Sequence, residues 1–186
     1  MVVGYSNQSF PTGRRTSTQI RPGGFLLFRP PARTEVGLGD MHVTDLTIHK
    51  LMGMQLAAAG EPHLLVLPES PLLLNHVGSI HAGVQFVLAE ACSGEFLLRY
   101  FGGDPSRVLA VLRGSKVKFR RPAHGELRAS AQLVEKGGAS PADELASRGR
   151  VLVSVLVEIA DANAVVTIRG RYDWFLRRAD TLISDP

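Results

Sequence analysis

The sequence of 186 residues contains one cysteine, Cys92, and no hydrophobic stretch long enough to span a bilayer. A single cysteine excludes an internal disulfide and a cysteine-rich zinc module. The most apolar run, residues 84–98, contains Glu90 and Glu95 and is shorter than the roughly 20 residues that a transmembrane helix needs. We therefore predict a reduced, cytoplasmic protein without a membrane span.

Extremes of composition are also absent. Hydrophobic residues make up 45% and charged residues 20% of the chain, which is the usual range for a globular domain and excludes collagen-like, coiled-coil and wholly disordered proteins. The length corresponds to one domain with a sizeable core. A mean hydropathy of +0.07 is slightly apolar and is consistent with a surface that another subunit covers.

The net charge of +4 is concentrated at the start of the chain. Residues 1–40 hold five arginines against two acidic residues, whereas the remaining residues hold 16 basic and 15 acidic side chains. Because the rest of the chain is nearly neutral and lacks basic patches interleaved with aromatic residues, we expect no nucleic-acid partner.

We expect three parts: an N-terminal arm at 1–40, a domain at 41–178 and a C-terminal tail at 179–186. The arm has six glycines and four prolines and no sustained apolar period, which is typical of a flexible segment. It is functionally silent, serves in targeting or partner binding, or is an extension of the gene model that precedes a true start at Met41.

The apolar pattern of the domain predicts an α+β fold. A buried central helix is expected at 80–101, because residues 82–94 are apolar or small on nearly every side. Alternating patterns predict four long antiparallel strands that form a meander. The full set of expected elements is a helix at 43–59, a strand at 63–67, a loop at 68–78, the helix at 80–101, strands at 108–119, 127–133, 151–159 and 164–174, and a loop at 136–147.

Glu90 is the unusual residue of the central helix. A buried carboxylate is costly unless it is paired, hydrogen-bonded or used in chemistry. None of its helical neighbours is a cation; they are Phe86, Val87, Ser93 and Gly94. Burial would raise its pKa and make it a candidate base or nucleophile. The alternative is a carboxylate that a distant arginine or backbone donors satisfy.

The run from Asn75 to Glu90 resembles the signature of hotdog-fold acyl-CoA thioesterases of the phenylacetate-degradation and 4-hydroxybenzoyl-CoA types. In that signature an Asn, a Gly and a His-Gly-Gly sequence lead into a helix, and an acidic residue follows nine positions after the His. His81 and Glu90 are nine positions apart here, and Glu90 ends an intact Leu-Ala-Glu. The run 117–125 is similar to the family's strand, Arg-Pro turn and strand. The resemblance covers residues 43–174 and implies a hotdog fold, a long central helix wrapped by an antiparallel sheet.

The resemblance also implies the roles of the site residues in thioester hydrolysis. Glu90 would act as general base or nucleophile, and Asn75 would orient water or substrate. The N–H of Ala82, at the helix N-terminus, would hold the thioester oxygen, although the family has glycine there. Ser93 could hydrogen-bond Glu90. His81 would be a site residue or, equally, a capping or packing histidine.

A thiol is a good leaving group, with a pKa of about 8.5, so this chemistry requires no cofactor; CoA is part of the substrate. Gly83, Arg120 and Arg121 are candidates for binding CoA, the arginines through its phosphates. The alternative for the arginines is the solvated face of a strand. We expect no metal site, because His76 and His81 have no third ligand at metal-binding spacing.

The leading hypothesis is therefore an acyl-CoA thioesterase. The resemblance implies a dimer or a dimer of dimers, in which Glu90 faces the other subunit's Ala82. The alternative is a non-catalytic hotdog protein that binds an acyl-CoA or fatty-acyl ligand as a sensor or carrier. A hydratase is less favoured, because His81 and Glu90 differ by half a turn in helical phase.

Overall fold

The computed structural model describes residues 42–102, 108–134 and 137–179. The expected arm at 1–40 and nearly all of the expected tail lie outside these ranges. The elements, in chain order, are the 3-10 helix η1 (Val43–Asp45), α1 (Thr47–Met52), β1 (Gln55–Leu56), β2 (Leu65–Leu67), the 3-10 helix η2 (Pro71–Leu73), α2 (Ala82–Tyr100), β3 (Val108–Phe119), β4 (Leu127–Leu133), α3 (Pro141–Arg148), β5 (Arg150–Ala160) and β6 (Val166–Arg178).

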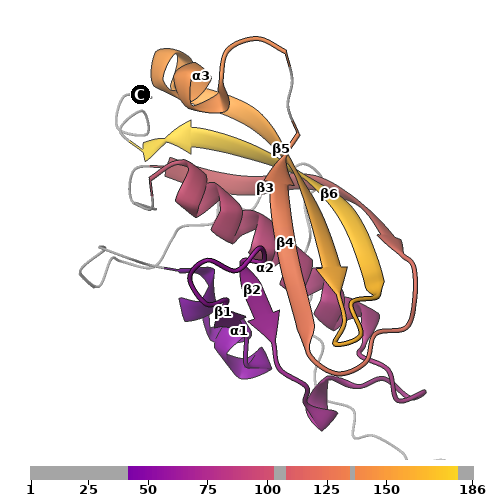
Figure 1. The fold of residues 1–186 in the computed structure, drawn as a ribbon. Helices are drawn as coiled ribbons and strands as arrows, with labels where there is room; N and C mark the ends of the chain where they lie inside the picture. The colour runs from indigo at the N-terminus through magenta and orange to yellow at the C-terminus, as the bar shows by residue number, and fades with distance from the viewer. Residues whose placement is uncertain (1–41, 103–107, 135–136, 180–186) are drawn as a thin grey trace, which may run out of the picture. The chain divides into compact units, whose positions relative to one another are not determined.

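The strands form one antiparallel sheet in the order β1-β2-β4-β5-β6-β3, and α2 packs against it (Figure 1). The α+β prediction is confirmed, but the predicted meander is wrong at β3. This strand pairs with β6 instead of β4. Residues 120–126, which contain Pro122, cannot form a tight two-residue hairpin, and the carbonyl of Ala123 accepts a hydrogen bond from Ile80 N–H at 2.9 Å.

Helix α2 forms where the sequence supplies a cap and an apolar interior. His81 is the N-cap, and its Nδ1 accepts the N–H of Gly83 at 2.9 Å. Leu88, Ala89 and Cys92 on this helix are fully buried in the core. Burial raises the pKa of the Cys92 thiol, and the nearby Glu95 carboxylate raises it further.

Two local expectations were wrong. The expected helix at 43–59 ends at Met52, because Gly53 takes a left-handed conformation with φ of 75° and the chain turns into β1. The expected loop at 136–147 contains α3. Ser140 caps this helix, Pro141 occupies its first turn, and Gly149 ends it with φ of 68°.

Candidate active site

Glu90 is half-buried on α2, and its carboxylate has no hydrogen bond or ion pair within the described residues. Burial raises the pKa of this carboxyl, and the charge of His49 lowers it by a smaller amount. The distant arginine or backbone donors that the alternative interpretation required are not present in the described part of the chain. An unpaired carboxylate with a raised pKa is a stronger base than an ordinary one and can accept a proton from water.

Glu95, five residues further along the same helix, provides an internal comparison. It is fully buried but accepts hydrogen bonds from Arg99 Nε at 2.9 Å and from the backbone N–H of Val43 at 3.3 Å. His42 Nδ1 lies 3.0 Å from the same carboxylate. Glu95 therefore joins the start of the domain to α2 and is structural, whereas Glu90 has no such partners.

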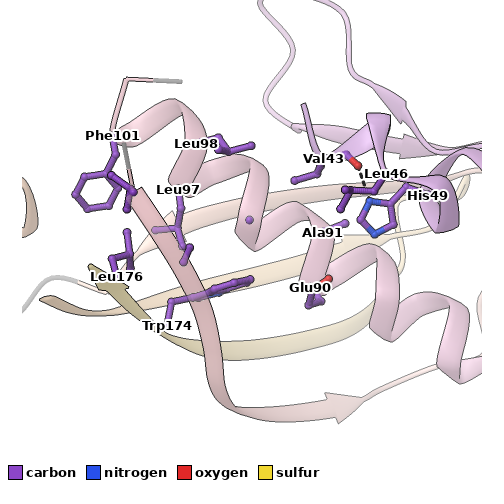
Figure 2. Close-up of a pocket in the computed structure, with 13 residues that line it drawn as sticks. Val43, Leu46, His49, Glu90, Ala91, Leu97, Leu98, Phe101, Trp174 and Leu176 are labelled. Atoms are coloured by element: carbon purple, nitrogen blue, oxygen red, sulfur yellow. Dashed lines mark hydrogen bonds between the residues drawn. The ribbon is translucent and has the colours of Figure 1, made fainter. Parts of the chain in front are cut away.

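Glu90 lines an apolar cavity of about 180 Å³ between α2, α1, β3 and β6 (Figure 2). The other polar side chain at the cavity is His49, from α1. The walls are otherwise apolar and include Leu97, Phe101, Trp174 and Leu176. The arrangement places one acid-base group against a space that suits an apolar ligand.

His49 is a cavity residue that the sequence alone does not reveal. The residue is 3% exposed, and its Nδ1 donates a hydrogen bond to the carbonyl of Val43 at 2.6 Å. Because a carbonyl only accepts, this bond fixes the proton on Nδ1 and leaves Nε2 as an acceptor in the neutral ring. Figure 2 shows the ring beside the cavity on the same side as Glu90. No sequence pattern identifies this residue, because its proximity to Glu90 depends on how α1 packs against α2.

Tyr172 on β6 is a second group that sequence analysis missed. The side chain is fully buried, and its hydroxyl has no hydrogen-bond partner in the described residues. Burial raises the pKa of this phenol, and the nearby Glu90 carboxylate raises it further. Gly170 makes room for the ring, since a Cβ there would lie 2.8 Å from Tyr172 Cε2.

Ser93 lies next to Glu90 but contacts its backbone. The Ser93 hydroxyl donates to the Glu90 carbonyl at 2.7 Å and accepts a hydrogen bond from Trp174 Nε1 at 3.0 Å. These bonds fix Trp174, which forms one wall of the cavity, against the helix. The structure therefore places Ser93 as a support of the cavity wall.

The start of α2 gathers four of the expected residues. The Asn75 side chain accepts hydrogen bonds from Val77 N–H and Ser79 N–H and donates to Ser79 Oγ, which closes the loop before the helix. The N–H of Gly83 is bonded to the His81 ring. By contrast, the N–H of Ala82, an exposed residue, has no acceptor within the described residues.

Ala82 and Glu90 do not meet within one chain. They are eight positions apart on one helix, a distance of about 12 Å along its axis. A single thioester group is too small to contact both. A site that uses both groups therefore needs two copies of the chain.

Arg120 and Arg121 follow the end of β3 and are exposed, without carboxylate partners in the described residues. With Lys118 they border a shallow hollow. The same segment reaches the start of α2, because Ala123 O bonds to Ile80 N–H. The two arginines are thus free to bind an anion.

The described residues offer neither a metal site nor a membrane-spanning helix. They contain no cluster of three or more His, Cys, Asp or Glu side chains that could hold a metal ion. None of their helices is long and apolar enough to cross a membrane.

The helix packed against this antiparallel sheet defines a hotdog fold, the fold of the thioesterase superfamily. The chain belongs to the family described as "Domain of unknown function (DUF4442)", whose model matches residues 59–176. No curated protein sequence matches it.

Solved structures with this fold include three bacterial proteins. A Pseudomonas aeruginosa protein of unknown function, described as a probable thioesterase, has 23% identity and a TM-score of 0.60, covering 76% of this chain and 99% of that chain. A Haemophilus influenzae thioesterase has 16% identity and a TM-score of 0.57, covering 74% and 87%. A Bacillus halodurans protein solved with CoA has 20% identity and a TM-score of 0.54, covering 69% and 74%. At these identities the likeness shows the shared fold.

Proposed function

We propose that this protein hydrolyses acyl-CoA thioesters to a free acid and CoA. The observation that carries the proposal is the Glu90 carboxylate, which is half-buried, unpaired within the described residues and placed at an apolar cavity. The contrast with the fully paired Glu95 supports a chemical role for Glu90. The thioesterase descriptions of proteins with the same fold agree with this reaction.

In the general-base route, Glu90 takes a proton from water as the water oxygen bonds to the thioester carbon. The carbonyl oxygen becomes an oxyanion, which the N–H of the partner subunit's Ala82 stabilises. Collapse of this intermediate breaks the C–S bond, and the CoA thiolate leaves and takes up a proton. In the nucleophilic route, Glu90 itself bonds to the carbonyl carbon, CoA leaves, and water then hydrolyses the resulting anhydride.

The edge strand β3 supports the two-copy arrangement that this chemistry requires. In the described residues it pairs with β6 along one edge, and its other edge has no partner strand. It is 12 residues long and exposes Leu109, Val111 and Phe119. A long edge strand with exposed apolar residues is a template for pairing with another chain. We propose a homodimer or a dimer of dimers.

CoA would bind at the start of α2. Arg120 and Arg121 would hold its phosphates, because both side chains are exposed and unpaired in the described part of the chain. Gly83 leaves the backbone open to close approach by the pantetheine arm. The Asn75 loop would position the water or the thioester. The hydrogen bonds between Asn75 and Ser79 would hold the loop in the conformation that this role needs.

A second candidate function is binding of acyl-CoA without hydrolysis, as a sensor or carrier. Ala82 favours it, since the resembling thioesterases have glycine at this position and a methyl group narrows the approach to the N–H. The cavity would serve such a protein equally well.

An assay of thiol release distinguishes hydrolysis from binding alone. It compares wild type, Glu90→Gln and the control Glu69→Gln on alkyl- and aryl-CoA substrates. Glu69 is exposed and does not line the cavity beside Glu90. Hydrolysis requires that wild type and Glu69→Gln turn over at least one substrate and that Glu90→Gln loses about a hundredfold or more. A wild type that is inert on every substrate but thermally stabilised by one of them would be a binder.

A further inference from the structure

One row of residues on α2 runs from Glu90 along the cavity. Glu90, Gly94, Leu98 and Phe101 are spaced at i, i+4, i+8 and i+11, which places them on one face of the helix, and all four are half-buried. All four line the cavity. Eleven residues of helix extend about 16 Å, so the residues that line the cavity span this length of the helix axis.

The polarity of the cavity is graded along this row. Figure 2 shows Glu90 and His49 toward one end, whereas Leu98, Phe101 and Leu176 lie at the other end. A ligand in this space would have its reactive, polar group at Glu90 and an apolar body that extends away from it. A lining that runs along one face of the helix over three turns suits an extended chain better than a single aromatic ring.

Gly94 lies in the middle of this row, and neither packing nor backbone conformation requires a glycine there. It has ordinary helical φ, and an added Cβ would lie 3.4 Å from Val43 Cγ1 and 4.0 Å from Trp174 Cη2, so an alanine fits. Glycine inside a helix is less stable than alanine. The missing side chain instead leaves space in the cavity between its polar and apolar ends.

We propose that this cavity binds a linear aliphatic acyl chain with the thioester at Glu90, and that Gly94 sets the longest chain that fits. The inference rests on the proposed function, because that function places the thioester at Glu90. A larger side chain at position 94 would block the path of the chain one helical turn beyond the carboxylate. Short acyl groups, which end before this point, would still bind.

The test compares wild type, Gly94→Val and Gly94→Ala on butyryl-, octanoyl- and palmitoyl-CoA, and wild type also on benzoyl-CoA. For each variant, kcat/KM is measured for the longest acyl chain that wild type hydrolyses and for butyryl-CoA. The quantity compared is the ratio of the first value to the second. We expect Gly94→Val to lower this ratio at least tenfold, with a smaller decrease for Gly94→Ala. Gly137→Val is the matched control, since a Cβ at Gly137 meets nothing within 4 Å, and it should leave the ratio unchanged. If Gly94→Val does not fold, Gly94→Ala carries the test.

An unchanged ratio, or an equal loss on every chain, would overturn the inference while the proposed function stands. A wild type that prefers benzoyl-CoA to every alkyl chain would overturn it too. If wild type hydrolyses none of the substrates, the proposed function fails, and the Kd values of the same acyl-CoAs for the same variants test the cavity. A tenfold weakening of the longest chain relative to butyryl-CoA would then support the chain site. Uniform Kd changes, or no binding, would exclude it.

Discussion

Replacement of Gly94 by alanine should stabilise the protein, because the structure leaves room for a Cβ at this position. Helix propensity favours alanine over glycine by about 1 kcal/mol in a helix interior. The added methyl group would contact Val43 and Trp174 at 3.4 and 4.0 Å. Full burial of a methylene-sized group contributes about 0.8 kcal/mol, and we take about half of this because Gly94 is half-buried.

The two contributions give a gain of about 1.4 kcal/mol, which corresponds to an increase in Tm of about 3–5 °C for a chain of this size. Urea denaturation and thermal unfolding of the ligand-free protein measure it. Gly83→Ala on the same helix is the control. A Cβ at Gly83 would crowd His81 Nδ1 at 3.1 Å and disturb the cap, so its gain should be smaller or negative. If Gly94→Ala lowers the stability, the Cβ does not fit, and the argument that position 94 is open for a ligand is refuted.

Three further predictions concern charged and titratable groups. Because burial raises the pKa of Glu90, its contribution to the free energy of unfolding should fall as pH rises from about 4.3 through the folded-state pKa, and kcat/KM should rise over the same range. The difference in unfolding free energy between wild type and Glu90→Gln isolates this contribution, since the lowered pKa of Asp45 adds an opposite dependence to both proteins. A difference that does not change with pH would contradict the prediction. His49→Ala should shift the acid limb of the kcat/KM profile to higher pH, because His49 lowers the pKa of Glu90; an unmoved limb would exclude this coupling. Arg99→Ala should lower the free energy of unfolding by about 2 kcal/mol in urea denaturation, because Glu95 is fully buried and loses a charged hydrogen-bond donor. The control Arg148→Ala removes an exposed ion pair and should lower it by less than about 0.5 kcal/mol. Equal effects of the two substitutions would show that the Arg99–Glu95 pair adds nothing to stability.

The long elements of the fold could be predicted from the sequence because each has a strong period. The alternating residues of 108–119 and 127–133 gave the bounds of β3 and β4 as the structure has them. The position of β3 beside β6 could not be predicted, because alternation marks a strand without identifying its partner. The Ser140 cap, Pro141 and Gly149 are a recognisable helix signal, yet the glycines before them favoured a loop.

The candidate site could be predicted only where its residues are close in sequence. Glu90 could be recognised as an unpaired carboxylate because its helical neighbours follow from sequence spacing alone. In the described residues it also has no partner from other elements. His49 and Tyr172 could not be found in this way. They reach Glu90 from α1 and β6, so their proximity depends on tertiary packing that leaves no local pattern.

The burial of Cys92 has a practical consequence for the study of this protein. Thiolates react with disulfide reagents, and this thiol is both inaccessible and held in its protonated form by its surroundings. The folded protein should therefore add almost no background to a colorimetric assay of released CoA. The same cysteine becomes reactive when the core opens, so its labelling rate without substrate measures how often α2 separates from the sheet. One reagent thus follows both turnover and transient unfolding.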